Sequence, residues 1–228
     1  MKTAIVTGAS RGLGLALARA LAERRWRLVL DARGAEELDA ARAELAELTE
    51  VAALAGDVAD DRHRLALVTA AGGTIEALVN NASVLGPSPL PPLAQYPLAE
   101  LAQVYRVNAL APLALVQAAL PRLARGARIV NVTSDAAVEA YEGWGGYGSS
   151  KAALEQLTRV LAAEHPELRV YAVDPGDMRT QMHQEAFPGE DISDRPPPEE
   201  SVPGLLALLE GDLPSGRYRA SELVRLEV

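Results

Sequence analysis

The chain has 228 residues and no cysteine, which excludes disulfides, thiolate nucleophiles and cysteine-ligated metals. Its formal net charge of −9 disfavours a nucleic-acid partner, because binding to a phosphate backbone needs a concentrated cationic surface. No apolar run approaches the ~20 residues that cross a bilayer, and the start MKTAIVTGAS does not resemble a secretory signal, so we expect a cytoplasmic protein with no membrane partner.

The first part of the chain alternates short apolar runs with stretches whose apolar residues recur at helical spacing. The predicted strands of this part are residues 3–7, 27–32, 51–58 and 75–83, and the predicted helices between them are residues 15–25, 35–48 and 60–71. Strands that alternate with helices predict one parallel sheet covered on both faces. The length favours a single domain over residues 1–228.

The second part continues this alternation. Residues 97–124 carry one long helical pattern, and Pro112 near its middle predicts a kink. A strand at 127–134, a helix at 149–164 and a strand at 168–176 follow.

The regular alternation then ends. Residues 177–203 contain Gly189 and three consecutive prolines at 196–198, which predicts a flexible surface loop beside the substrate. A short helix at 201–211 and a last strand at 216–222 complete the pattern. The sequence therefore predicts a doubly wound α/β domain with a parallel sheet of about seven strands.

The stretch TGASRGLG lies between the first predicted strand and helix. It places Gly8, Gly12 and Gly14 where the backbone turns sharply and can approach a ligand closely. The N–H groups and dipole at a helix start favour a pyrophosphate there. An ordinary strand-to-helix turn is the alternative, but the position in the first βα unit favours nucleotide binding.

The stretch YGSSK places Tyr147 and Lys151 four residues apart, so on a helix they share one face. A free tyrosine has a pKa near ~10, and a nearby ammonium favours its ionised form. Taken alone, such a pair is more often a packed tyrosine and a solvated lysine.

Two further polar residues require an explanation. Ser134 lies just past a predicted strand, where it can serve as a turn or cap residue. Asn108 lies inside the long helical pattern, although asparagine is unfavourable there because its amide competes for backbone hydrogen bonds.

Together with NNAS at 80–83 and the pair Pro175–Gly176, these motifs resemble the short-chain dehydrogenase/reductase family in order and separation, from Thr7 to about Thr180. The resemblance implies a Rossmann-type domain, a nicotinamide dinucleotide and hydride transfer between a carbonyl and a secondary alcohol. It also implies a catalytic set composed of Asn108, Ser134, Tyr147 and Lys151.

In this interpretation Tyr147 is the general acid in reduction and the general base in oxidation. By resemblance, Ser134 hydrogen-bonds the reacting oxygen, and Asn108 holds a water that continues a proton relay through Lys151.

The resemblance further implies which residues contact the cofactor. They lie in the glycine-rich turn and at the ends of the predicted strands: Gly8, Ser10, Arg11, Gly12, Leu13, Gly14, Arg33, Asp57, Val58, Asn81, Ala82, Tyr147, Lys151, Pro175, Gly176 and Thr180. For Asp57 a helix N-cap is an equal alternative.

The choice of dinucleotide depends on the end of the second strand. Asp31 could accept hydrogen bonds from an adenosine ribose, and Arg33 could pair with a 2′-phosphate. In the family's NAD binders the acid falls one position later, where this chain has Ala32. Arg11 adds a second cation, so charge complementarity favours NADP(H) over NAD(H).

The predicted function is an NADP-dependent carbonyl reductase or alcohol dehydrogenase acting on a small molecule. The alternative is a dinucleotide-binding regulator or scaffold with little turnover, and the intact catalytic set favours the enzyme. Side chains predicted to line an apolar substrate pocket are Leu85, Tyr141, Trp144 and Met182. Asp177, Met178 and Arg179 are candidates for shaping substrate choice, although Arg179 is more simply an exposed loop residue.

The remaining predictions concern partners and metals. The family resemblance suggests a homodimer or homotetramer built on the helices around 100–124 and 149–164. The three histidines, His63, His165 and His183, lack metal-ligand spacing and are interpreted as surface or loop residues, so no metal is predicted.

Overall fold

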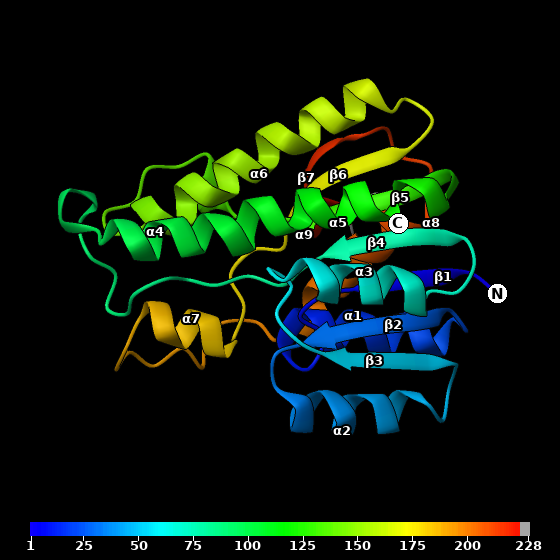
Figure 1. The fold of residues 1–228 in the computed structure, drawn as a ribbon. Helices are drawn as coiled ribbons and strands as arrows, with labels where there is room; N and C mark the ends of the chain where they lie inside the picture. Colours follow the sequence, from blue (N-terminus) through cyan, green and yellow to red (C-terminus); the bar gives the residue numbers. More distant parts are fainter. Residues whose placement is uncertain (224–228) are drawn as a thin grey trace.

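A computed structural model describes residues 1–223, and the final residues of the predicted domain, 224–228, lie outside them. Within the described part, seven strands form one parallel sheet in the order β3-β2-β1-β4-β5-β6-β7 (Figure 1). The strands are β1 (Thr3–Val6), β2 (Arg27–Ala32), β3 (Val51–Ala55), β4 (Ile75–Asn80), β5 (Leu123–Val132), β6 (Arg169–Asp174) and β7 (Gly216–Arg219). The predicted doubly wound fold is confirmed.

Helices cover both faces of the sheet (Figure 1). They are α1 (Gly12–Glu23), α2 (Ala35–Leu45), α3 (Asp61–Ala70), α4 (Leu98–Tyr105), α5 (Ala111–Ala119), α6 (Gly145–Glu164), α7 (Gln181–Ala186), α8 (Val202–Glu210) and α9 (Ala220–Leu223). Ala4 and Val6 of β1 pack with α1 and α8, whereas Ile5 packs with α3 and α5. Successive residues of a strand point to opposite faces, so both faces of β1 are buried and its sequence is apolar throughout.

The order of the strands determines where a ligand can bind. From β1 the chain moves to β2 and β3 on one side, and then returns to place β4 to β7 on the other side. Crevices in open parallel sheets form beyond the carboxyl ends of the strands at such a reversal. The crevice of this fold therefore lies beyond the ends of β1 and β4.

The long helical pattern is interrupted around Asn108 rather than bent at Pro112. A π-helical turn, η2 (Arg106–Leu110), separates α4 from α5, and Pro112 lies in the first turn of α5. Proline has no N–H to donate to the carbonyl four residues earlier, so the regular ladder is broken at residue 108. The pattern also ends early, because the short 3-10 helix η3 (Leu120–Arg122) leads directly into β5.

Helix α6 begins four residues before its predicted start, at Gly145 instead of 149. Both Tyr147 and Lys151 therefore lie on the helix, one turn apart, as their spacing requires for a shared face.

The predicted substrate loop contains regular structure, which the sequence interpretation missed. Within 177–203 the chain forms α7 and the 3-10 helix η5 (Pro198–Ser201). The segment is tied to its surroundings by the bond from Ser88 Oγ to Glu185 O, at 2.7 Å, and from Ser201 Oγ to Pro175 O, at 2.8 Å. These partners are distant in sequence, so local composition did not reveal them.

The last predicted strand is shorter than expected, because Ala220–Leu223 form α9. In residues 1–223, no helix has the length and apolar character needed to span a membrane.

Candidate active site

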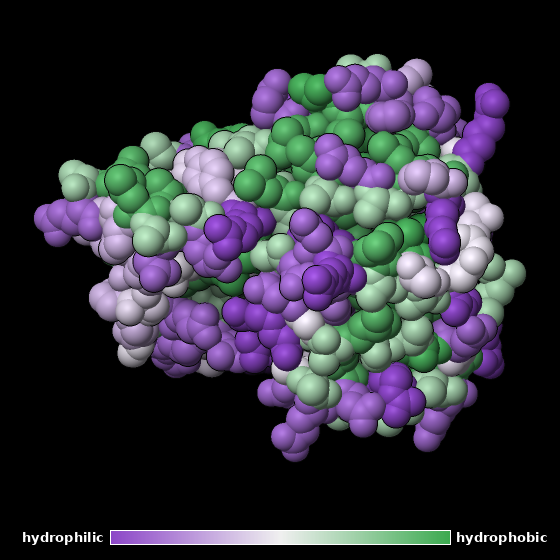
Figure 2. Space-filling model, viewed as in Figure 1, coloured by the Kyte–Doolittle hydropathy of each residue, from purple (hydrophilic) through white to green (hydrophobic). Residues whose placement is uncertain are grey.

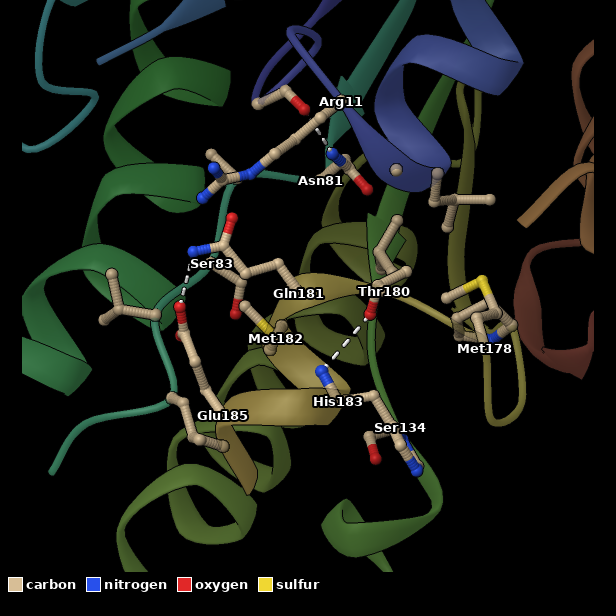
Figure 3. Close-up of a pocket in the computed structure, with 18 of the residues that line it drawn as sticks. Arg11, Asn81, Ser83, Ser134, Met178, Thr180, Gln181, Met182, His183 and Glu185 are labelled. Carbon is tan, nitrogen blue, oxygen red and sulfur yellow. Dashed lines mark hydrogen bonds between the residues drawn. The ribbon is translucent and has the colours of Figure 1, made fainter. Parts of the chain in front are cut away.

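A cavity of about 1220 Å³ opens at the predicted crevice. Figure 3 shows it between the glycine-rich turn that carries Arg11 and the residues of α7. Of the predicted site residues, only Gly14 and Asn108 do not line it. The structure brings all the others to one cavity: Gly8, Ser10, Arg11, Gly12, Leu13, Arg33, Asp57, Val58, Asn81, Ala82, Ser134, Tyr147, Lys151, Pro175, Gly176 and Thr180.

The glycine-rich turn is held in a conformation that suits glycine. Gly8 and Gly12 have φ values of 65° and 57°, in the left-handed region. Gly14 faces inward, and a Cβ there would overlap Gly8 O and lie 2.6 Å from Asn81 Nδ2. Asn81 Nδ2 itself donates to Thr7 O at 2.9 Å and to Gly8 O at 3.1 Å. Asn81 therefore holds the turn by hydrogen bonds. Gly14 allows the turn to pack closely against α1, although Gly14 itself does not line the cavity.

Helix α1 starts in this turn without a capping side chain. Its N-cap residue Arg11 has an extended backbone and makes no side-chain cap bond. The first N–H groups of a helix have no partner within the helix, and together with the helix dipole they attract an anion. This end of the cavity is suited to a phosphate group.

Asp31 is committed to the protein rather than to a ribose. It is 1% exposed, its Oδ1 accepts the Gly8 N–H at 2.8 Å, and its Oδ2 lies 3.1 Å from Nε2 of His63. Arg33, two residues on, is exposed and lines the cavity. The end of β2 therefore presents a cation to a ligand, while its carboxylate holds the glycine-rich turn.

The interpretation of His63 as a surface residue was wrong, since its side chain is 10% exposed and bonds Asp31. His183 was also misassigned, because it is 9% exposed and its ring lies 4.9 Å from that of Phe187.

The N-cap of α3 is Asp60, whereas Asp57 accepts the N–H of Ala59 at 2.8 Å.

Tyr147 and Lys151 are both buried on α6. The Lys151 Nζ lies 5.5 Å from the centre of the Tyr147 ring and donates to Val132 O at 2.8 Å. Burial lowers the pKa of Lys151 to about 7, since desolvation disfavours the charged amine.

The expectation that Lys151 eases the ionisation of Tyr147 does not hold for the protein by itself. Burial raises the pKa of Tyr147, and the carboxylates of Asp174 and Asp135 raise it further. The chain therefore keeps Tyr147 as a protonated phenol at neutral pH, and its proton is harder to release than that of an exposed tyrosine.

Ser134 follows β5 and reaches the cavity (Figure 3). Its hydroxyl donates to Asp135 Oδ1 at 2.9 Å, and Asp135 Oδ2 accepts the Tyr141 hydroxyl at 3.0 Å. A bond to an ionised acceptor is stronger than one to a neutral acceptor. Asp135 therefore competes with any other acceptor for the Ser134 proton.

Asn108 is fully buried and uses its whole amide within the protein. Its Oδ1 accepts Val84 N–H at 2.9 Å and Ser83 Oγ–H at 3.2 Å. Its Nδ2 donates to Val84 O at 2.9 Å and to Ser150 Oγ at 3.0 Å. The side chain thus ties the chain after β4 to α6 and makes no direct bond with Lys151, whose ammonium bonds a strand carbonyl instead.

The end of the cavity near Trp144 is apolar and aromatic. Leu85 and Tyr147 pack with Trp144, Met182 and Phe187, and the rings of Trp144 and Tyr147 lie 5.8 Å apart. The predicted pocket residues all line the cavity: Leu85, Tyr141, Trp144 and Met182.

The loop residues proposed for substrate choice reach the cavity from the chain that follows β6. Asp177, Met178 and Arg179 line the cavity, and Arg179 is exposed as expected. Thr180 caps α7 by accepting the His183 N–H at 3.3 Å (Figure 3).

Ser83 and Asp135 are the site residues that the sequence interpretation missed. Each directly follows a predicted site residue, Ala82 and Ser134, at the end of a strand. Adjacency to a strand end was the available signal, because the carboxyl ends of parallel strands meet at one edge of the sheet.

The low pKa of Lys151 predicts how the free energy of unfolding should depend on pH. An unfolded lysine titrates near 10.5 and the folded one near 7, so the unfolded chain binds more protons between these values. This group therefore adds stability as pH rises from about 7 toward 10.5, and that contribution is lost as pH falls. Without added cofactor, Lys151→Met should flatten this part of the curve of unfolding free energy against pH, measured with urea. Lys2→Met, which changes an exposed lysine, should leave the slope unchanged; an unaltered slope in Lys151→Met would contradict the assignment.

Known proteins are similar to this chain in sequence and in fold. A family model described as short chain dehydrogenase matches residues 2–191. The chain is 35% identical over 212 residues to L-xylo-3-hexulose reductase of Hypocrea jecorina (strain QM6a), covering 82% of this chain and 70% of that protein. Among solved structures, a short chain dehydrogenase from Shigella flexneri is 27% identical, with a TM-score of 0.89 and coverage of 96% of this chain and 91% of the other. An alcohol dehydrogenase from the archaeon Thermococcus sibiricus, solved with 5-hydroxy-NADP, is 28% identical, with a TM-score of 0.86 and coverage of 96% and 95%.

Proposed function

The chain belongs to the short-chain dehydrogenase family, and from this premise we propose that it is an NADP-dependent carbonyl reductase or alcohol dehydrogenase with Tyr147 as its general acid and base. Membership of the family makes it an oxidoreductase that transfers a hydride between a nicotinamide cofactor and a small carbonyl or secondary alcohol. The observation that carries the finer proposal is the single cavity shared by the glycine-rich turn, Arg33 and Tyr147.

The residues of the cavity fit a dinucleotide. The inward-facing Gly14 keeps the turn compact, and the uncapped start of α1 offers N–H groups to a pyrophosphate. When bound, the nicotinamide supplies or accepts the hydride, and all other tasks fall to the chain.

The chain's main chemical task is proton transfer at the Tyr147 oxygen. In reduction Tyr147 donates its proton to the oxygen of the substrate, and in oxidation it takes the hydroxyl proton. When the bond from the Ser134 hydroxyl to Asp135 breaks, that hydroxyl donates a hydrogen bond to the substrate oxygen instead. The aromatic wall formed by Trp144 and Phe187 holds the apolar part of the substrate and reduces the access of water.

Preference for NADP(H) is supported by the end of β2. Asp31 is occupied by the Gly8 N–H, which leaves Arg33 and Arg11 as exposed groups that could meet the adenosine end. A guanidinium pairs well with a phosphate, because its N–H groups form a planar fork. The Thermococcus relative was solved with an NADP derivative, which is consistent with this preference.

Arg33→Ala should weaken NADPH binding by ~10-fold or more and leave NADH binding within about 2-fold, because a hydrogen bond to a charged group contributes ~1.5–3 kcal/mol. Titration of the fluorescence of each reduced cofactor measures both constants. Arg125→Ala, an exposed arginine that does not line the cavity, is the matched control and should change neither constant. If Arg33→Ala lost equal affinity for NADPH and for NADH, the assignment of Arg33 to the 2′-phosphate would be wrong.

We also propose a homodimer or homotetramer formed through the helices α4, α5 and α6. In the upper part of the face shown in Figure 2, hydrophobic residues gather over these helices. Leu98 of α4 and Leu110 of the π-helical turn are 78% and 56% exposed, and Val160 of α6 is 42% exposed. Sedimentation velocity measures the assembly directly.

The cytoplasmic location stays a prediction.

A panel of ketones, aldehydes and secondary alcohols, each assayed with NADPH or NADP⁺ and with NADH or NAD⁺, tests the proposed function. We expect turnover of at least one apolar carbonyl, with higher kcat/KM for the phosphorylated cofactor. Binding of cofactor without any turnover across the panel would instead favour a regulator or scaffold.

A further inference from the structure

His63 lies beside the end of β2, and the function proposed above gives it no task. Residues two apart on a strand point to the same face, so Val29 and Asp31 of β2 both face α3. His63 and Leu67 are four apart on α3 and share one face of that helix. Val29 and Leu67 pack in the same core cluster, and Asp31 meets His63 with 3.1 Å between Oδ2 and Nε2. Asp31 lines the cavity, whereas His63 lies outside its lining.

The ring of His63 has a fixed direction. Its side chain is 10% exposed, and the ring packs so closely on Gly56 that a Cβ at residue 56 would overlap it. The backbone N–H of His63 donates to Oδ1 of Asp60, the N-cap residue of α3, which anchors this turn of the helix. Gly56 follows β3 and lines the cavity, so the ring lies directly behind the cavity wall. These contacts leave Nε2 of His63 aimed at Asp31.

Both carboxylate oxygens of Asp31 have a partner within the protein. Oδ1 accepts the Gly8 N–H at 2.8 Å, and Oδ2 faces Nε2 of His63. An ionised carboxylate can only accept hydrogen bonds, so Nε2 is the ring nitrogen that carries the proton in this contact. Asp31 is buried, and a buried charged oxygen that loses its donor is strongly unfavourable. Asp31 therefore depends on His63 for the second of its two partners.

A free Oδ2 on Asp31 would change which cofactor the site prefers. NADH carries a 2′-hydroxyl on its adenosine ribose, and this group can donate to a carboxylate. NADPH carries a phosphate there, and its negative charge is repelled by a carboxylate. Arg33 is exposed and lines the cavity, and a guanidinium pairs well with a phosphate. Holding Asp31 within the protein therefore leaves Arg33 to set the preference for NADP(H).

We propose that His63 is a positioning residue that determines cofactor choice through Asp31. Its Nε2–H holds the carboxylate against the glycine-rich turn, so that the 2′-phosphate of NADP(H) meets Arg33 without a competing negative charge. This inference rests on the proposed function, because it concerns the nicotinamide cofactor of that same cavity.

His63→Leu tests this role through the ratio of two dissociation constants, that of NADH divided by that of NADPH, both measured by fluorescence titration. We expect the ratio to fall by about 10-fold or more, the size of one hydrogen bond to a charged group. His63→Gln keeps an N–H donor on a planar side chain and should hold the ratio within about 2-fold of the parent's. His165→Leu changes a half-buried histidine that bonds Glu167 instead, and it should change neither constant.

Equal losses of affinity for the two cofactors in His63→Leu would leave the ratio unchanged and would overturn the proposal, since they would indicate a structural role only. A parent that prefers NADH does not weaken the test, because the expected change in the ratio has the same direction.

A double-mutant cycle with Asp31→Asn separates the carboxylate from the packing of the ring. Asp31→Asn keeps an oxygen for the Gly8 N–H but carries no negative charge. In this background His63→Leu should leave the ratio within about 2-fold, because no carboxylate remains to be released. The same fall in the ratio with and without the carboxylate would show that residue 63 does not act through Asp31.

A further measurement needs no cofactor and no folded leucine variant. The chain has three histidines, so labelling their rings with ¹⁵N gives few resonances, and His63→Gln assigns those of residue 63. Nε2 of His63 should be protonated in the parent. An unprotonated Nε2 would overturn the proposal, because the ring would then have no proton to give to Asp31. Absence of turnover by the parent across the panel would overturn the proposed enzyme instead and would leave the binding ratios and the resonances readable, so the two failures can be told apart.

Discussion

Tyr147→Phe should reduce turnover by a factor of about 10³ or more and leave the binding of NADPH within about 2-fold, since general acid–base catalysis contributes ~10²–10⁴-fold. The substitution removes one oxygen from a buried, packed ring, and phenylalanine keeps the contact with Trp144. The hydroxyl that exchanges the proton is lost, and the ring is kept. Steady-state kinetics with the best carbonyl of the panel and a fluorescence titration of NADPH measure the two quantities.

A second tyrosine provides the matched control. Tyr105 lies at the end of α4, does not line the cavity, and can be changed to phenylalanine without touching the proposed machinery. Tyr105→Phe should keep the parent's kcat and KM. Comparable turnover in Tyr147→Phe and the parent would defeat the assignment of Tyr147, whatever the fate of the cofactor.

The state of Tyr147 in the protein explains why the effect should be large. Burial and the carboxylates of Asp174 and Asp135 hold the pKa of Tyr147 above its ordinary value. The raised pKa keeps the phenol protonated at neutral pH and makes its proton harder to release, so reduction and oxidation both need positive charge or hydrogen bonds to support the phenolate. A positively charged oxidised nicotinamide would supply part of that support when bound.

Gly14→Ala should destabilise the protein by roughly 3 kcal/mol and abolish measurable cofactor binding, because overpacking against fixed backbone costs ~1–3 kcal/mol or more. A Cβ at residue 14 would overlap Gly8 O and crowd Asn81 Nδ2, which are both held by hydrogen bonds. The turn would have to open, and the N–H groups of α1 would leave their positions. Scanning calorimetry should show a fall in Tm of about 10 °C, at ~2–4 °C per kcal/mol for a chain of this size.

Gly73→Ala is the control for this experiment. A Cβ at Gly73 would meet no atom within 4 Å, and its φ lies outside the left-handed region. This variant should keep the Tm within about 1 °C and bind NADPH normally. If Gly14→Ala bound NADPH with the parent's affinity, the close approach of Gly14 and Gly8 would not be required for the phosphate-binding turn.

Several features were predictable because they depend on neighbouring residues. The alternation of apolar runs and helical patterns correctly predicted the elements of the sheet from β1 to β6. The glycines of the first turn and the four-residue spacing of Tyr147 and Lys151 are local as well. These patterns record which residues face a core and how a helix places its side chains, and both follow from backbone geometry.

Other features depended on partners far along the chain. Asp31 looked available to a ribose, but it holds Gly8 and His63, which are 23 and 32 residues away. The predicted kink at Pro112 became a π-helical turn at 106–110, and Asn108 bonds residues 24 and 42 positions away. Helix α7 formed in a segment whose prolines and glycine predicted a loop.

The sequence by itself determined the class of fold, the order of its elements and the residue types at the edge of the sheet, because these follow from periodicity and turn chemistry within short windows. Only the tertiary structure decided which of these side chains remain free for a ligand. Hydrogen bonding between distant segments occupies Asp31 and Asn108, and burial keeps Tyr147 protonated. The free energy of a buried polar group depends on the partners that folding brings to it, and those partners are set by the whole chain.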